Sequence, residues 1–191
     1  PEEVALAAAW VWVVGGLVGQ QYASGTISYS HASVQVSTYG FTRGGGLVGD
    51  SAGAIQRSYA TGDVGANSYG VILGGLVGQN EAAGTIAQSY ATGAVALNSS
   101  TGGNSTYIGG FVGYNFGAIT QSYATGAVSF IINDETLEAF VQYGAGAFAG
   151  TQQTTGSISE AYATGLVHAE NDWVASCPGC GNGPTAIRTG F

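Results

Sequence analysis

The sequence has 191 residues, of which 45% are hydrophobic and only 7% charged, with 34 glycines and three prolines. This hydrophobic fraction excludes a disordered chain, and collagen is excluded because glycine does not recur at every third position and proline is scarce. The net charge of −8, with three arginines and no lysine, excludes nucleic acid as a partner because a phosphate-binding surface needs clustered cations. The composition predicts a β-rich chain with many tight turns.

The first hydrophobic run, residues 4–14, is too short to span a membrane, which takes about 18 residues. Glu2 and Glu3 precede it, where a signal peptide would carry Lys or Arg. We therefore expect no membrane insertion and interpret residues 1–14 as the end of a preceding coil. Because the chain starts at Pro1 and lacks methionine, we expect it to be processed or part of a longer protein.

A glycine-rich pentapeptide then recurs along the chain. Gly-Gly-Leu-Val-Gly begins at residues 15, 45 and 74, and related versions begin at 109 and 146. A repeat length between 20 and 50 residues is typical of solenoids, propellers and arrays. We predict a five-repeat domain over residues 15–167, followed by a tail, residues 168–191, outside the repeat.

Each pentapeptide is followed by a second block, Ile-x-x-Ser-Tyr-Ala-Thr-Gly-x-Val. If Val64 points inward, the two-residue period of a strand turns Ser58 and Ala60 inward and Tyr59 outward. The opposite assignment would place the tyrosines in the core. The outward assignment makes a candidate contact surface, because aromatic side chains bind sugar faces and proteins; a row that only stabilises stacking would look the same. The surface consists of Tyr59, Tyr90, Tyr123, Tyr162, Thr61, Thr92, Thr125 and Thr164.

The segments that return the chain to the next Gly-Gly vary in length. They grow along the chain, over residues 37–44, 65–73, 96–108 and 129–145. Insertions at one point of each repeat map to loops on one face of a solenoid, often its binding face.

Helical repeats would need ten or more residues of 3.6-residue spacing per unit, which the Gly-Gly pairs interrupt. Propeller blades run to 40 or more residues with four antiparallel strands. We predict instead an all-β parallel β-helix, a β-solenoid of about five coils, in which equivalent residues form ladders. The paired glycines would avoid a clash at a tight corner or allow a positive φ. The internal ladders would be Leu17, Leu47, Leu76, Phe111 and Phe148, and Ile27, Ile55, Ile86, Ile119 and Ile158.

The tail contains Cys177-Pro-Gly-Cys180, whose spacing favours a local disulfide, with unpaired thiols, a redox pair or half of a zinc site as alternatives. A zinc site would need two further ligands, and the only histidines are His31 and His168. We expect no metal and no cofactor.

Parallel β-helices can also cleave polysaccharides, which requires two or three converging carboxylates. Asp50 and Asp63 share a repeat, and residues 134, 135 and 138 are acidic (Asp134, Glu135, Glu138). We interpret these acids as solvated charges and expect no enzymatic activity.

The two blocks together, Gly-Gly-Leu-Val-Gly followed by Gly-x-Ile-x-x-Ser-Tyr-Ala-Thr-Gly-x-Val, resemble the GLUG-motif repeat over residues 15–167. The first unit departs from it at His31 and Val34, and the last at Ala147 and Ala149. The family occurs in large bacterial surface and secreted proteins, including filamentous-haemagglutinin-like adhesins and non-catalytic regions of peptidases that cleave immunoglobulin A. The resemblance implies a right-handed β-helix at the cell surface or secreted, and it transfers no ligand or catalytic residue.

We therefore expect a non-enzymatic adhesin segment, a β-helical stalk that presents loops. Its partners would be a protein or glycan on a host or neighbouring cell, or copies of itself. One alternative is a structural subunit that stacks end to end into a filament or sheath, and a more remote one is a polysaccharide-active β-helix enzyme.

Overall fold

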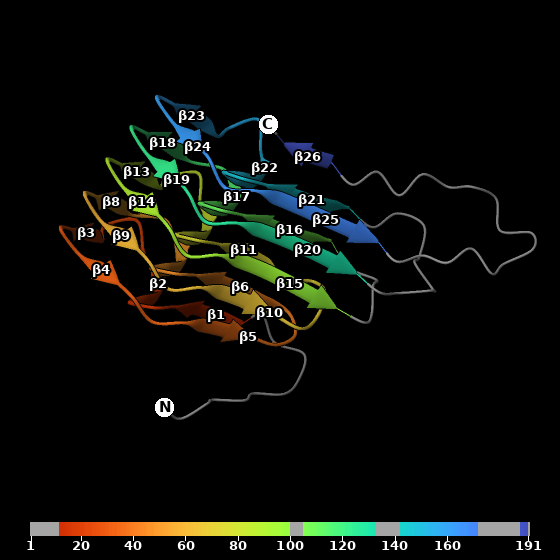
Figure 1. The fold of residues 1–191 in the computed structure, drawn as a ribbon. Coiled ribbons are helices and arrows are strands. Elements are labelled where there is room, and N and C mark those ends of the chain that lie inside the picture. The colour runs from red at the N-terminus through yellow and green to blue at the C-terminus, as the bar shows by residue number, and fades with distance from the viewer. Residues whose placement is uncertain (1–11, 100–104, 133–141, 172–187, 191) are drawn as a thin grey trace, which may run out of the picture.

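The structure is a computed structural model that describes residues 12–99, 105–132, 142–171 and 188–190. These residues form strands β1 to β26 and no helix (Figure 1). Accordingly, no helix that is long and apolar enough to cross a membrane occurs in this part of the chain.

Every coil consists of five short strands in the same order. The first coil contains β1 (Trp12–Gly15), β2 (Val18–Gln21), β3 (Thr26–Ser28), β4 (His31–Ala32) and β5 (Val36–Thr38). The second contains β6 (Thr42–Gly45), β7 (Val48–Ser51), β8 (Ala54–Gln56), β9 (Tyr59–Ala60) and β10 (Val64–Ala66). The third contains β11 (Ile72–Gly74), β12 (Val77–Asn80), β13 (Thr85–Ala87), β14 (Tyr90–Ala91) and β15 (Val95–Ser99).

The fourth coil contains β16 (Thr106–Gly109), β17 (Val112–Asn115), β18 (Ala118–Thr120), β19 (Tyr123–Ala124) and β20 (Val128–Ile132). The fifth contains β21 (Tyr143–Gly146), β22 (Ala149–Gln152), β23 (Ser157–Ser159), β24 (Tyr162–Ala163) and β25 (Val167–Asn171). Strand β26 (Arg188–Gly190) follows and pairs with β21. Residues beyond 167 therefore also take part in the stack.

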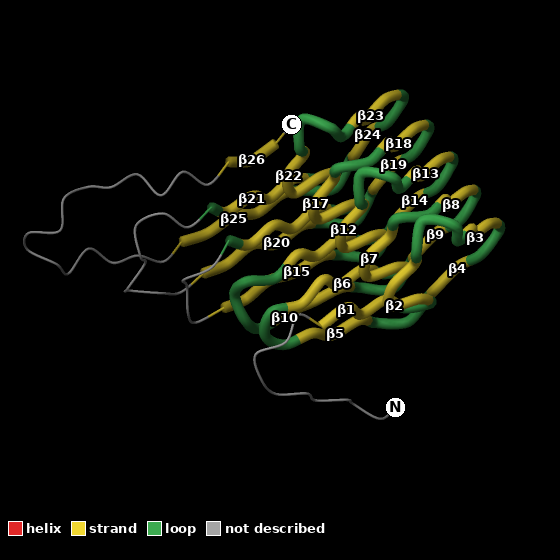
Figure 2. The backbone as a smooth tube through the Cα atoms, turned by 180° about the vertical axis from the view of Figure 1, so that it is seen from behind, coloured by secondary structure: helices red, strands yellow, loops and turns green. Residues whose placement is uncertain are grey.

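Equivalent strands pair in parallel along the axis, so the first strands of all coils form one sheet, the second strands another, and so on (Figures 1 and 2). The first sheet has six strands and the second to fifth sheets have five each. Five strands are separated by four steps, so the chain makes about four turns. The fold class is as predicted, and the expected five coils correspond to five strand layers rather than five complete turns.

The interior holds two hydrophobic clusters. One contains Leu47, Leu76 and Phe111 together with Ile55, Ile86 and Ile119, as the sequence predicts. Leu17 departs from this pattern because it lies in the first coil and is 48% exposed. The second cluster lies between the first and fifth sheets and includes Leu73, Ile108, Val64, Val95 and Phe130.

The paired glycines are explained by close contact between coils. A Cβ at Gly46 would lie 2.2 Å from the carbonyl oxygen of Gly75, and one at Gly75 would lie 2.1 Å from that of Gly110. Positive φ is not the reason, because the only described glycines with positive φ are Gly40 and Gly70. At this corner each Cβ would point at the following coil.

At a second glycine position the Cβ would point in the opposite direction along the axis, toward the preceding coil. A Cβ at Gly62 would lie 1.9 Å from the carbonyl oxygen of Val34, in the preceding coil. This geometry explains one departure from the repeat. Val34 is compatible with the first coil because, among the described residues, no coil lies on the side to which its Cβ points.

The corner between the third and fourth sheets is built from residues other than glycine. The residue before the recurring Ser position, which is Ala161 in the fifth coil, has a φ between 48° and 51° in every coil. Such a φ is uncommon for a residue with a side chain. The sequence pattern does not predict this left-handed corner. The residues are Tyr29, Arg57, Gln88, Gln121 and Glu160.

Candidate functional site

The tyrosine row lies on the outside of the solenoid. The neighbouring alanines, Ala60, Ala91 and Ala124, are fully buried, whereas Tyr59 is only partly buried and Tyr162 is 58% exposed. Alternate residues of a strand point to opposite sides. The assignment with the tyrosines in the core is therefore wrong, and Val64, Ala60 and Ser58 point inward.

The rings of this row stack face to face. Centroids are 4.7 Å apart for Tyr59 and Tyr90, 5.0 Å for Tyr90 and Tyr123, and 5.2 Å for Tyr123 and Tyr162, with planes within 7° of parallel. His31 pairs in register with Tyr59 and extends the column at 4.9 Å. The rings cover one another, so the column exposes ring edges and hydroxyl groups rather than faces. Burial, with the neighbouring tyrosines, raises the pKa of Tyr90.

Beside this column lie the four threonines of the predicted contact surface, Thr61, Thr92, Thr125 and Thr164, all exposed. Their backbone amides are used within the stack; that of Thr92, for example, donates to the carbonyl of Ala60 at 3.0 Å. The contact role of the Tyr and Thr row stays a prediction.

A polar ladder runs along the left-handed corner. Arg57 Nε donates to Gln88 Oε1 at 2.8 Å, and Gln88 Nε2 donates to Gln121 Oε1 at 3.1 Å. The Arg57 guanidinium also donates to the Tyr29 hydroxyl and lies 5.3 Å from the centre of its ring. These exposed side chains link four successive coils.

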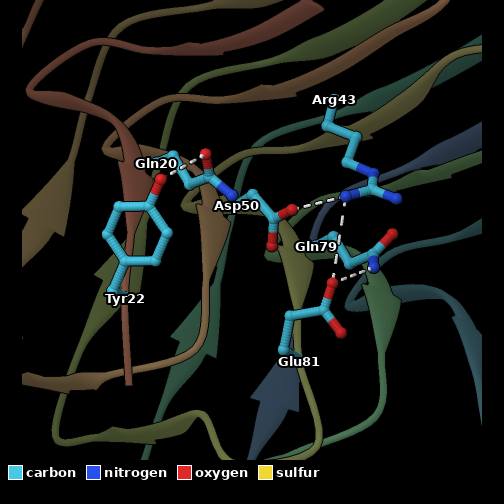
Figure 3. A network of polar contacts seen from close by, with 6 residues as sticks. All are labelled: Gln20, Tyr22, Arg43, Asp50, Gln79 and Glu81. Carbon is cyan, nitrogen blue, oxygen red and sulfur yellow. Dashed lines mark hydrogen bonds and ion pairs between the residues drawn. The ribbon is translucent and has the colours of Figure 1, made fainter. Parts of the chain in front are cut away.

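Charged side chains meet at the Gly-Gly corner between the first and second sheets (Figure 3). Arg43 on β6 donates from Nη1 to Asp50 Oδ2 on β7 at 2.5 Å. Glu81 Oε1 lies 3.8 Å from the same nitrogen and accepts a hydrogen bond from Gln79 Nε2 at 2.5 Å. Asp50 is only 3% exposed. Burial raises its pKa, and the charge and hydrogen bond of Arg43 oppose that shift only in part.

In the fourth coil, aromatic side chains occupy the ladder positions that Arg43 and Asp50 hold in the second coil. Tyr107 pairs in register with Ile72, and Tyr114 with Gln79. The ring centroid of Tyr114 is 5.0 Å from that of Tyr107 and 4.5 Å from that of Phe116, at interplanar angles of 41° and 36°. The Tyr114 hydroxyl accepts a hydrogen bond from Gln153 Nε2 at 2.7 Å. Burial and, to a smaller extent, Tyr107 raise its pKa.

The carboxylates singled out in the sequence do not form a pair. Asp50 bonds to Arg43, whereas Asp63 is exposed and accepts a hydrogen bond from the Ala94 amide at 2.8 Å. His168 lies 3.3 Å from Glu170, and His31 is in the aromatic column. The described residues contain no group of three side chains suited to a metal ion. Asp134, Glu135, Glu138, Cys177 and Cys180 lie outside the described residues.

The register of these coils defines a parallel β-solenoid repeat protein. Three segments, residues 12–37, 69–96 and 104–129, match the model of the GLUG motif, so the chain carries GLUG-motif repeats. They lie in the first, third and fourth coils, and the second and fifth coils stack on them in register. No curated protein matches the chain, and no solved structure does.

Proposed function

We propose that the chain is a non-enzymatic β-solenoid segment of a bacterial protein that is secreted or held at the cell surface, where it acts in adhesion. One observation carries the proposal. The recurring residues are used for stacking, as core ladders, corner glycines and the aromatic column, while one ladder position at which the coils differ, occupied by Arg43, Ile72 and Tyr107, is partly exposed. Stacked coils form a stiff support because each strand is hydrogen-bonded along the axis. Its partner would be a protein or glycan on a host or neighbouring cell.

Adhesion can be tested with beads coated with the chain. We expect them to remain on a monolayer of cultured epithelial cells under flow when albumin-coated beads are washed away. Equal retention of both kinds of bead would contradict the adhesive role. An antiserum against the chain should in addition label intact bacteria that make the protein, and external protease should remove the labelled material. A signal found only after lysis would contradict the surface location.

End-to-end assembly into a filament is the second candidate. It is favoured by the exposed large hydrophobic side chains of the described residues. These lie in the first and last coils or directly after the first, from Leu17 to Phe41 and at Tyr162 and Leu166. It is opposed by Val34, whose side chain points to where a preceding equivalent coil would place a carbonyl oxygen, and by β26, which already pairs with β21 at the other end. We therefore favour the isolated segment.

Sedimentation separates these candidates. We expect the chain to sediment as a monomer, because Val34 obstructs one end and β26 covers the edge of the first sheet at the other. Fibres formed by the unmodified chain would instead establish the filament.

A further inference from the structure

The Gly-Gly corner carries a surface that differs from the rest of the solenoid. We call it the corner surface and define it as Arg43, Asp50, Gln79, Glu81, Tyr107, Tyr114 and Phe116. From its geometry we infer that the corner surface binds a neutral glycan chain, with Tyr114 as the apolar platform and Arg43 and Glu81 as hydrogen-bonding groups. Gln79 is only 5% exposed and positions Glu81. This inference rests on the proposed adhesive function and names the chemical class of its partner.

The polar half of the surface is held in place by the buried residue Asp50. Asp50 is nearly inaccessible and binds one nitrogen of Arg43, whose side chain is 31% exposed. Glu81 is 38% exposed and is oriented by Gln79. A guanidinium has five donors, and a carboxylate only accepts. Sugar hydroxyl groups both donate and accept, so a positioned guanidinium beside a carboxylate is complementary to them.

The aromatic half differs from the tyrosine column. In the column, neighbouring rings are within 7° of parallel and cover each other's faces. Tyr114 is inclined by 41° to Tyr107 and by 36° to Phe116, and all three side chains are partly exposed. The C–H face of a sugar packs on such an apolar ring surface. Tyr114 is paired in register with Gln79, so the platform lies directly beside the hydrogen-bonding groups.

The charge of the corner surface and the length of its ladder restrict the class of glycan that it can bind. The surface has one arginine, largely neutralised by two carboxylates, and the whole chain carries a net charge of −8. Uronic acid or sulfated polymers would therefore be repelled. The ladder Gln20, Asp50, Gln79 and Tyr114 runs along the axis through four coils, a span of about 14 Å at the usual strand spacing. This length suits a short stretch of an extended glycan.

The test is affinity electrophoresis of the 191-residue chain in native gels that contain barley β-glucan, mannan or galactan, with polygalacturonate as the anionic comparison. We expect at least one neutral polymer to retard the chain and polygalacturonate not to do so. Tyr114→Ala and Glu81→Ala should each weaken retardation at least about tenfold, whereas Tyr114→Phe, which keeps the ring, should retain it. Tyr123→Ala, in the aromatic column, is the matched control and should bind normally. Circular dichroism checks that each variant is folded.

Several results would overturn the inference: no retardation by any of the three neutral polymers, stronger retardation by polygalacturonate, or normal binding by folded Glu81→Ala and Tyr114→Ala chains. The bead experiment separates this inference from the adhesive role. If beads carrying Tyr114→Ala adhere to cells as well as unmodified ones and Tyr114→Ala is also retarded normally in the gels, adhesion stands and the glycan surface does not. If beads fail to adhere but retardation depends on Tyr114, the glycan surface stands and adhesion does not.

Discussion

Tyr59 and Tyr90 stack face to face across neighbouring coils, with ring centroids 4.7 Å apart and planes 3° from parallel. Their spacing is the strand spacing itself, so the contact is a direct result of in-register pairing. The column that they begin stabilises the stack, and this use of the rings limits what else their faces can contact.

Truncating the middle of the column should therefore destabilise the protein. Tyr90→Ala removes the contacts to both Tyr59 and Tyr123, and we expect the free energy of unfolding to fall by about 1–3 kcal/mol. Urea unfolding followed by circular dichroism measures the change. Tyr162→Ala is the control: Tyr162 has one neighbour in the column and is 58% exposed, so its loss should be clearly smaller. Equal losses would show that stacking is not the stabilising interaction.

The corner glycines allow a test with a matched pair of glycine-to-alanine changes. At Gly75 a Cβ would lie 2.1 Å from the Gly110 carbonyl oxygen, whereas at Gly65 the nearest atom would be 3.7 Å away. We expect Gly75→Ala to cost about 3 kcal/mol or more, because backbone must move. Gly65→Ala should be neutral or stabilising by up to about 1 kcal/mol, since it restricts the unfolded chain. Urea midpoints compare the two, and a tolerated Gly75→Ala would mean that the coils are not this close.

Repetition determined what could be predicted from the sequence. Leu47, Leu76 and Phe111 recur at one position of the repeat, so their ladder follows once parallel stacking is inferred. The strand period likewise places Tyr59 outside and Ala60 inside. In contrast, the contact of Arg43 with Asp50 occurs in one coil only and joins strands of two different sheets. Because it does not recur along the chain, the repeat pattern of the sequence could not predict it. His31 departs from the repeat in residue type, but its imidazole ring stacks on Tyr59 and so continues the column.

The buried serines make a ladder whose importance can be measured. Ser89 Oγ donates to the Ala87 carbonyl at 2.9 Å and accepts the amide of Ser58 at 3.2 Å. Ser89→Ala takes this partner from the buried Ser58 amide, whereas the Ala87 carbonyl still accepts the Arg57 amide at 3.0 Å. We therefore expect a loss of about 1–3 kcal/mol in the free energy of unfolding. The reverse change is available in the last coil, where Ala161 occupies the serine position. Ala161→Ser should stabilise the protein; a destabilising effect there would contradict the proposed geometry.

Asp50 should make stability depend on pH. Its pKa in the folded protein is raised above the ordinary value of 3.8 by burial. Between these two pKa values the folded chain binds a proton that the unfolded chain has lost, so stability falls as pH rises through this window and is regained on acidification. We expect Asp50→Asn to remove this component. The measurement is the urea-unfolding free energy of both chains at a series of pH values upward from 3.5, taken as a difference so that the other acids cancel.

Two further variants test whether Asp50 causes that pH dependence of stability. Arg43 lowers the pKa of Asp50 and Glu81 raises it. Arg43→Gln should therefore move the loss of stability to higher pH, and Glu81→Gln should move it to lower pH. If Asp50→Asn keeps the pH dependence of the unmodified chain, or if the two neighbouring variants shift it in the same direction, the buried carboxylate does not control it. The opposite shifts are the signature of Asp50, because Arg43 and Glu81 act on its pKa in opposite directions.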